Sequence, residues 1–430
     1  MNGSNEIIIG ATNTQFIDGD RSARYPKREE YVDSGIMFLN GESISRGTIN
    51  KEAVNFITEQ KYRDIKKGRI ARNDILLTTR GNSIGDAAFV TTSDKGLINA
   101  QMLILRVDSR DIHPKYLFYY ITSNSLRNYI LNFASGSAQP QIPIRDLKKI
   151  PIYLPKIQVQ KKIAAILSAY DELIENNRRR IALLEKMAGE IYREWFVRLR
   201  FPGHKHVEKF KRVPIGWREA KLGDLIPEVG LQTGKRPIGG AQDSGIPSIG
   251  AENVVGLARH DFSKEKYVNE HFFDSMRQGH IADKDVLFYK DGAEIGRVTL
   301  VQDGFPHEKC CVNEHVFVIR TRDLDAQYFL YFYLNQEIIQ EYVKTINKNA
   351  AQPGINKSEL RSIPILLPHS GLIQEFENVV SPIIRQIFQL AKTQRTLTKT
   401  RDLLLPRLIS GKLSVEHLDI QFPPGMEDRP

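Results

Sequence analysis

The sequence predicts an α/β (α+β) fold in which one domain occurs twice and a long helix follows each copy. The first observation is a repeated phrase, since AQPQIPIRDLKKIPIYLP at 138–155 returns as AQPGINKSELRSIPILLP at 351–368. The second is a set of short β-rich runs between helical runs in each copy, and the third is a heptad pattern after each phrase. Together they predict two similar domains separated by two long antiparallel coiled-coil helices, with a pseudo-two-fold axis between them.

The repeated phrase is unfavourable for a helix or an inner strand, because it contains several prolines and proline lacks the N–H donor that both structures use. Its recurrence indicates duplication of a unit made of one domain and one helix. Further matches follow in the same order: DSGIMFLNGESI from Asp33 with DSGIPSIGAENV from Asp243, and GRIARNDILLTTRGNSIGDAAFV from Gly68 with GHIADKDVLFYKDGAEIGRVTLV from Gly279. We expect the phrase to be architectural, with its I-P-I-x-L-P part forming a last strand that delivers the chain to the helix.

Within each copy, runs such as DILLTT, MLILRV and VFVIR are separated by Gly, Asn and Asp, as strands and tight turns are. Helical runs such as PKYLFYYITSNSLRNYILNF lie between them. Each copy is therefore expected to contain a curled sheet with helices, in an order that the sequence leaves open.

After each phrase, apolar residues recur at alternating steps of four and three, which is the pattern of a coiled-coil seam. In the first half the seam is Ile163, Leu167, Tyr170, Ile174, Asn177, Ile181, Leu184, Ala188, Ile191 and Trp195. In the second half it is Phe376, Val380, Ile383, Ile387, Leu390, Gln394, Leu397, Arg401, Leu404 and Leu408. The polar Asn177 either specifies the register of the pair or lies at a partly solvated position.

Capping signals predict that a short helix precedes a long one in each half. Ser381 and Pro382 are typical of an N-cap and first helical residue, and Ser168 with Asp171 fits a capping box. A long helix from Ala169 to about Leu199 would span roughly 45 to 50 Å.

Composition favours a polyanionic partner. The 430 residues carry a formal net charge of +10, and contacts of Lys and Arg with phosphates release condensed counterions.

No stretch approaches the roughly 20 apolar residues of a membrane-spanning helix, and a cytoplasmic location is expected. The two cysteines, Cys310 and Cys311, are adjacent in an apolar run and are expected to be buried thiols.

Two copies of a basic domain held apart by rigid helices fit a bipartite site on double-stranded DNA, because one turn of duplex measures roughly 34 to 36 Å. The copies have diverged, with TTRGNSIGD in one and YKDGAEIGR in the other. We therefore expect the two halves of the DNA site to differ.

Candidate DNA-binding residues lie at these tips and near the start of each domain. Arg pairs with guanine, Asn with adenine, and Lys with a base or a phosphate. The alternative is that charged residues beside glycine are simply solvated hairpin and loop residues. The candidates are Arg21, Arg24, Arg80, Asn82 and Ser83 in the first copy, and Lys235, Arg236 and Lys290 in the second.

Two common catalytic motifs are missing from the sequence, since it contains neither the phosphate-binding G-x-x-x-x-G-K-[ST] nor H-E-x-x-H. Histidines such as His307 and His315 lack metal-ligand spacing, so no metal site and no catalytic residue is expected. Asp285 with Lys290, or Asp261 with Lys266, match a nuclease pattern only in the way that acids and bases do in any highly charged chain.

Taken together, the two AQP-x-I…I-P-I-x-L-P phrases, the two long helices, WREAKLGD at 217–224 and LLLPRLISGKL from Leu403 resemble the specificity subunit of type I restriction–modification enzymes, over nearly the whole chain. The resemblance implies two target-recognition domains and a subunit that is not itself an enzyme. It also implies docking to two methyltransferase subunits and, through them, to restriction subunits. S-adenosylmethionine, ATP and Mg would then belong to those partners, with no cofactor in this chain.

The resemblance gives expected boundaries for each part of the chain. These are a first target-recognition domain at 1–155, a first helical spacer at 156–200, a linker and second target-recognition domain at 201–368, a second helical spacer at 369–415 and a C-terminal tail at 416–430. The first copy departs from the pattern, since NEIIIGATNTQF stands where the second has WREAKLGD. We expect its initial strand to be replaced or lost.

The outer faces of the helices, with NNRRR from Asn176 and KTQRTLTKTR from Lys392, are candidate docking surfaces for the methyltransferase. A solvated face or a stripe that steers phosphates is the alternative, and both roles can hold together. The candidate docking residues are Arg178, Arg179, Arg180, Trp195, Arg395 and Arg401. For the whole chain, the alternative function is a free-standing sequence-specific regulator or anti-restriction protein that binds DNA without partners.

Overall fold

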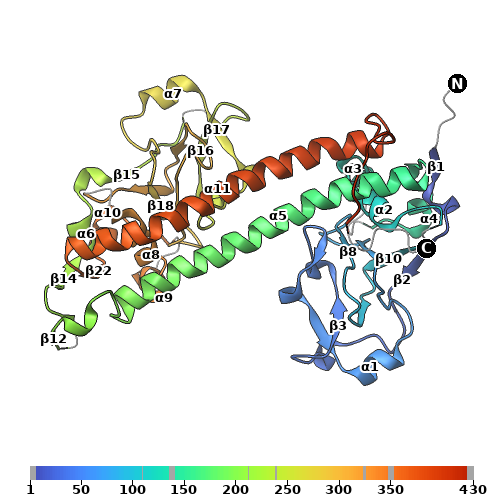
Figure 1. Cartoon of the computed structure of the whole chain (residues 1–430), viewed down its shortest axis with the longest axis horizontal. Helices are drawn as coiled ribbons and strands as arrows, with labels where there is room; N and C mark the ends of the chain where they lie inside the picture. The colour runs from blue at the N-terminus through green and yellow to red at the C-terminus, as the bar shows by residue number, and fades with distance from the viewer. Residues whose placement is uncertain are drawn as a thin grey trace. The chain divides into compact units, whose positions relative to one another are not determined.

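The computed structural model describes residues 6–108, 110–134, 141–211, 213–237, 240–322, 326–346 and 353–423 (Figure 1). The chain forms two compact units, one built from Met1–Leu173 with Leu397–Pro430 and the other from Ile174–Thr396. The first residues of the repeated phrase, at 138–140 and 351–352, lie outside the described residues. Each unit contains one copy of the repeated domain and part of both long helices.

The first unit is built around two small sheets. One has the order β2-β10-β7-β8 and is antiparallel throughout, and the other has the order β6-β3-β9, in which β3 and β9 are parallel. Their strands are β2 (Thr14–Asp18), β3 (Ile36–Leu39), β6 (Asn55–Ile57), β7 (Ile75–Thr78), β8 (Ala87–Phe89), β9 (Gly96–Ile98) and β10 (Met102–Val107), with a hairpin of β4 (Ile44–Ser45) and β5 (Thr48–Ile49). The helices are α1 (Glu59–Asp64), α2 (Pro114–Ile121), α3 (Asn124–Ala134) and α4 (Ile144–Leu147).

The second unit repeats this topology. Its sheets have the orders β15-β21-β18-β19 and β17-β16-β20, again with one parallel pair, between β16 and β20. The strands are β12 (Lys209–Phe210), β13 (Val213–Pro214), β15 (Leu231–Thr233), β16 (Ile246–Ile249), β17 (Lys266–Val268), β18 (Val286–Tyr289), β19 (Val298–Leu300), β20 (Cys311–Val312) and β21 (Val316–Ile319). The helices are α6 (Leu222–Leu225), α7 (Glu270–Ser275), α8 (Gln327–Leu334), α9 (Glu337–Ile346) and α10 (Lys357–Arg361). The predicted duplication is confirmed at the level of strand order.

The initial strand of the first copy is present in a replaced form. β1 (Glu6–Ile8) pairs antiparallel with β11 (Pro151–Tyr153), as β14 (Arg218–Lys221) pairs with β22 (Pro364–Leu367) in the second copy. The next residues match as well, because the N–H of Ile9 donates to Ile150 O at 2.9 Å and that of Leu222 to Ile363 O at 2.8 Å. The run EIIIG at 6–10 therefore takes the place of EAKLG at 219–223, so of the two expected outcomes the strand is replaced and not lost.

The two long helices are unbroken, so the predicted division into a short and a long helix is wrong. α5 runs from Ile157 to Tyr192 and α11 from Ser370 to Ile409. Ser168 lies inside α5, where its hydroxyl donates to Ala165 O at 3.2 Å, and Pro382 lies inside α11. Proline inside a helix costs about 3 kcal/mol, and burial of the continuous apolar face on both sides of Pro382, including Phe376 and Ile387, offsets this cost.

Every residue of the predicted seam is buried or half-buried, which confirms the heptad pattern. In the second unit the end of α5 packs against the start of α11, where the ring of Tyr192 lies 5.8 Å from that of Phe376. In the first unit the start of α5 packs against the end of α11, and Ile163 and Leu167 share a core with Leu408. Within each unit the two helices thus run antiparallel.

One ion pair with a buried carboxylate braces the four-stranded sheet of each unit. In the second unit Arg320 donates through Nε and Nη2 to the two oxygens of Asp285, at 2.6 and 2.7 Å. In the first, Arg106 donates in the same way to Asp74, at 2.8 Å for both contacts. The pairing joins β21 to the start of β18, and β10 to the start of β7, so the same clamp is present in both copies.

The predicted burial of the cysteines is confirmed, because both side chains are only 1% exposed. Burial raises the pKa of the Cys310 thiol to about 12 and that of Cys311 to about 11. Both groups are therefore poor nucleophiles at neutral pH. None of the helices within the described ranges combines the length and the apolar character that crossing a membrane requires.

Candidate nucleic-acid interface

Three segments of the first unit meet at one end of its four-stranded sheet. They are residues 19–21 after β2, the turn 99–101 between β9 and β10, and the loop 79–86 between β7 and β8. The N–H of Thr79 donates to Gln101 O at 2.8 Å, which joins the loop to the turn. A Cβ atom at Gly19 would lie 2.1 Å from the carbonyl oxygen of Asn99, so only glycine allows the third segment to lie against this turn.

The second unit builds the same platform from residues 234–236, 313–315 and 290–296. The N–H of Lys290 donates to His315 O at 3.0 Å, as Thr79 does to Gln101. A Cβ atom at Gly234 would lie 1.6 Å from Val312 O, so this glycine is required in the same way as its counterpart. The backbone is therefore conserved between the two copies of this chain while the side chains that it presents differ.

The loop between β7 and β8 is a tight turn with polar residues at its tip. Gly85 donates to Thr78 O at 2.9 Å and Ile84 to Gly81 O at 3.2 Å, and the Ile84 side chain is buried beneath the tip. Asn82 is exposed and Ser83 is half-buried. A tip fixed from below by its backbone and by one apolar side chain can hold Asn82 out toward a ligand.

The repeated phrase lies beside this loop in both copies. Gln141 forms a bridge with Arg80, and Ile142 donates to Thr79 O at 3.0 Å. In the second copy Gly292 donates to Pro353 O at 2.7 Å and Ile355 to Lys290 O at 2.9 Å. The phrase thus has a second architectural role, because its residues 141–142 and 353–355 anchor the loop while its last residues form β11 or β22.

The tips differ strongly in charge pairing. Arg80 is half-buried and its guanidinium has no hydrogen-bond or ion-pair partner among the described residues. Lys290, in contrast, lies 2.5 Å from Asp291 Oδ2, and His315 Nδ1 lies 3.1 Å from the same oxygen. Within the described parts of the chain, the first copy therefore presents an unpaired cation at its tip, and the second presents a network of donors and acceptors.

The remaining four DNA-binding candidates lie on the segments after β2 and β15. One of them, Arg24, contacts a residue that is distant in the sequence. Arg21 lies 3.0 Å from Asp18 and Arg236 lies 3.5 Å from Glu314, and the two arginines follow the equivalent glycines by the same number of residues. Lys235 is exposed. Arg24 donates to Asp64 O at 3.3 Å instead of turning toward the loop.

Sequence reasoning missed the contribution of the turn before β10 and β21. Gln101 is exposed there, and Glu314 and His315 occupy the equivalent turn. The sequence carried one signal, because both turns begin with Asn at the end of a parallel strand. The backbone N–H groups of Asn99 and Asn313 donate to Leu39 O at 2.8 Å and to Ile249 O at 3.0 Å.

Three of the candidate docking residues are used inside the chain. Trp195 is buried and packs edge-on against Phe376. Arg401 lies 2.6 Å from Asp171, which also accepts a hydrogen bond from Tyr119 at 2.7 Å. Burial opposes the charge of Arg401, yet the Asp171 carboxylate keeps the pKa of this guanidinium above its ordinary value.

The third of these residues, Arg395, donates to Pro306 O at 2.8 Å and covers the ring of Phe262 at 4.0 Å. Arg178 and Arg179 contact Glu175 on the same helix at 2.6 and 3.0 Å. Arg179 and Arg180 are exposed, so these two remain the candidates best placed for a partner.

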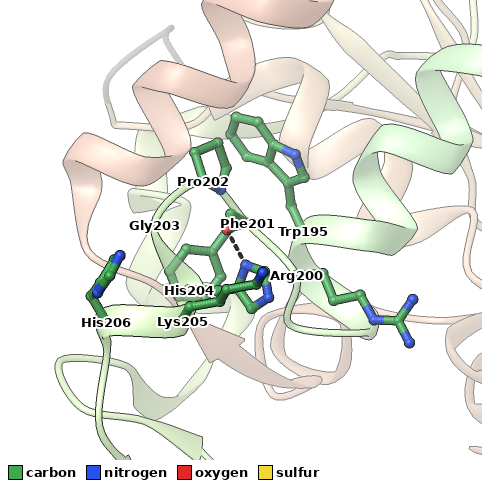
Figure 2. Close-up of a pocket in the computed structure, with 8 residues that line it drawn as sticks. All are labelled: Trp195, Arg200, Phe201, Pro202, Gly203, His204, Lys205 and His206. Carbon is green, nitrogen blue, oxygen red and sulfur yellow. Dashed lines mark hydrogen bonds between the residues drawn. The ribbon is translucent and has the colours of Figure 1, made fainter.

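A cavity of about 450 Å³ lies at the segment that follows α5. Figure 2 shows Trp195, Phe201 and Pro202 along its wall, with His204 in front of them and its Nδ1 2.8 Å from Phe201 O. Arg200 and His206 extend away from His204 on opposite sides. None of the predicted DNA-binding residues lines this cavity, so it is separate from the interface described above.

The residues that matched a nuclease pattern have structural partners. Asp285 belongs to the buried ion pair with Arg320, and Asp261 caps a short helix by accepting from the N–H of Ser263 at 3.1 Å. Lys290 pairs with Asp291 and Lys266 with Glu252 at 3.3 Å. Neither pair brings an acid and a base to a common point.

Comparison with known proteins agrees with this architecture. Residues 16–186 and 214–396 match the family model described as type I restriction modification DNA specificity domain. The type I restriction enzyme MjaIX specificity subunit of Methanocaldococcus jannaschii is 28% identical over 386 residues, which cover 87% of this chain and 84% of that protein. The HindI specificity subunit of Haemophilus influenzae is 21% identical over 456 residues, covering 92% of this chain and 98% of that protein.

A solved structure shares the fold. The crystal structure of a type I restriction–modification system S subunit from M. genitalium gives a TM-score of 0.60 at 18% identity, covering 94% of this chain and 95% of that one. The resemblance inferred from the sequence is thus confirmed, and with it the expectation of a DNA-specificity subunit in place of a catalytic one. The chain belongs to the family of type I restriction modification DNA specificity domains and carries two matches to that domain.

Proposed function

We propose that this chain reads a bipartite, non-palindromic DNA sequence for a type I restriction–modification enzyme, with one half read by each copy of the domain. The observation that carries the proposal is the platform of three segments, which has the same backbone contacts in both copies but different side chains at its tip. Arg80 and Asn82 stand in one tip, while Lys290, Asp291 and Glu294 stand in the other. Different donors and acceptors recognise different base edges.

The proposed division of labour follows the boundaries predicted from the sequence. Residues 1–155 and 201–368 would be the target-recognition domains, 156–200 and 369–415 the helical spacers, and 416–430 a tail. The basic candidates Arg21, Lys235 and Arg236 would bind phosphates beside the tips, since phosphate contacts fix register while base contacts carry sequence information.

The partners of the proposed complex are two methyltransferase subunits and restriction subunits. S-adenosylmethionine, ATP and Mg would be bound by those subunits. The docking surface proposed here combines Arg179 and Arg180 with two exposed apolar residues of α5, Leu183 and Met187. Leu183 and Met187 are four residues apart and so lie on one face of the helix.

Replacing Leu183 and Met187 together by aspartate is expected to weaken binding of the cognate methyltransferase by roughly tenfold or more, because buried apolar anchors dominate interface energies. Titration calorimetry with the purified partner measures the effect. A Val229→Asp variant, which also charges an exposed apolar site, is the matched control and should bind as the unmodified chain does. Equal affinity in the double variant and the control would place docking elsewhere.

The proposed function is tested by mapping adenine methylation in cells that carry a cognate methyltransferase subunit, with and without this gene. A split methylated motif is expected only when the chain is present. Exchanging residues 201–368 for those of a relative with another motif should then change one half of the motif and leave the other intact. Tight and sequence-specific binding of the chain alone, with no methylated motif beside an active partner, would favour a free-standing DNA-binding regulator.

A further inference from the structure

Two histidines and one glutamate of the second unit converge at one point, although no metal-ligand motif joins them in the sequence. His260 Nε2 lies 2.7 Å from Glu265 Oε1, and His307 Nε2 forms a hydrogen bond with the same oxygen. The three ligand atoms all lie within 4.8 Å of one another. The side chains of His260 and Glu265 are buried, and that of His307 is 19% exposed.

The two oxygens of Glu265 have separate partners. Oε2 accepts a hydrogen bond from the Tyr267 hydroxyl at 2.8 Å, while Oε1 faces both imidazole nitrogens. Two imidazole nitrogens and one carboxylate oxygen are a donor set that Zn²⁺ accepts, with water completing a tetrahedron. A hydroxyl that holds the second carboxylate oxygen is a typical outer partner of such a ligand.

We propose that His260, Glu265 and His307 bind a zinc ion. The ion would join the loop before β17 to the loop before β20, which are far apart in the chain. Tetrahedral bonds of 2.0 to 2.2 Å would place the ligand atoms about 3.3 Å from one another. Both contacts of Glu265 Oε1 with the imidazole nitrogens are hydrogen-bond separations, 2.7 Å for His260 and shorter for His307, so binding requires each nitrogen to move away from this oxygen by roughly half an ångström or more.

The charges around the cluster favour a cation on balance. A cavity of about 260 Å³ borders His307, and its lining includes the carboxylates of Asp283, Asp303 and Glu308. An opposing charge comes from Arg395, whose guanidinium is held by Pro306 O and by the ring of Phe262. The acidic wall offsets this charge and attracts divalent cations from solvent.

The same contacts could also be a hydrogen-bonded network in which both imidazoles donate to Glu265 without any ion. The His307→Gln substitution separates the two cases. The glutamine amide can still donate to Glu265, which preserves the network, but it removes the imidazole ligand.

The experiment uses the full chain without a histidine tag, stripped with a chelator and then dialysed against Zn²⁺. Mass spectrometry is expected to find one zinc ion per chain, with a higher melting temperature in zinc than in chelator. His307→Gln and His260→Gln should lose both the bound zinc and the zinc-dependent rise. His271→Gln, at an exposed histidine of α7, is the matched control and should keep them.

Two further measurements guard against a variant that fails to fold. Tyr267→Phe keeps all three ligands and should weaken zinc affinity by roughly tenfold to a hundredfold. Co²⁺ bound to the unmodified chain should give the visible absorption of a tetrahedral site. The proposal is overturned if the unmodified chain retains no more zinc than His307→Gln, or if zinc leaves its melting temperature unchanged.

Discussion

Replacing Asp285 by alanine is expected to lower the free energy of unfolding of the second unit by about 3 to 5 kcal/mol, because it leaves the Arg320 charge without its buried partner. The Asp285 side chain is fully buried and that of Arg320 is 27% exposed. Asp285 also accepts from the N–H of Ala282 at 2.7 Å, so the substitution removes a third hydrogen bond. Few single substitutions reach this size.

Urea denaturation followed by tryptophan fluorescence measures this effect selectively, since both tryptophans, Trp195 and Trp217, lie in the core of the second unit. Asp74→Ala is the matched control because it breaks the equivalent pair with Arg106 in the first unit. It should leave the tryptophan transition unchanged while lowering a transition seen by circular dichroism. An Asp285→Ala transition that coincides with that of the unmodified chain would show that the pair is dispensable.

Replacing Arg80 by alanine is expected to reduce affinity for the DNA site by about 1 to 3 kcal/mol, which is roughly five- to 150-fold. The guanidinium has no partner in the described part of the chain, and its backbone is held by Gln141 on one side and through Thr79 on the other. The backbone is therefore fixed, and the guanidinium is available for a bidentate contact. The loss should appear as relaxed preference at one position of one half-site.

Fluorescence anisotropy with duplexes that vary one base pair at a time measures the preference, once the methylated motif is mapped. Arg72→Ala is the matched control, because this exposed arginine lies at the opposite end of β7 from Arg80. If Arg80 contacts only phosphate, affinity falls equally for all duplexes and the salt dependence becomes shallower by about one unit. Unchanged affinity for every duplex would contradict a role in the interface.

The features that were predicted correctly from the sequence are those that depend on the spacing of neighbouring residues. The seam from Ile163 to Trp195 repeats every three or four residues, and burial follows that period. The adjacent Cys310 and Cys311 stand in the strand-like run CCVNEHVFVIR, and they are buried. Because the domain is duplicated, each feature occurs twice in the sequence. The prediction for one copy therefore supports the prediction for the other.

The features that escaped prediction depend on contacts between distant residues or on competing local signals. Asp285 and Arg320 are 35 residues apart, in a chain whose charged residues are 26% of the total, so no spacing singles out this pair. Pro382 suggested a helix start, but the buried face of α11 outweighs its local preference. His307 joins His260 only because two loops fold against each other.

The first unit is completed by residues from the far end of the chain. Leu408 and Val415 are buried in its core, and Lys162 donates to the carbonyl oxygens of Glu416 and Leu418, both at 2.7 Å. During synthesis the ribosome delivers the residues up to 173 first and these closing residues last, whereas residues 174–396 form one continuous segment. The second unit thus has all of its residues before the first does. The domain that is begun first is finished last, and its apolar surface stays open to chaperones and proteases for the longest part of translation.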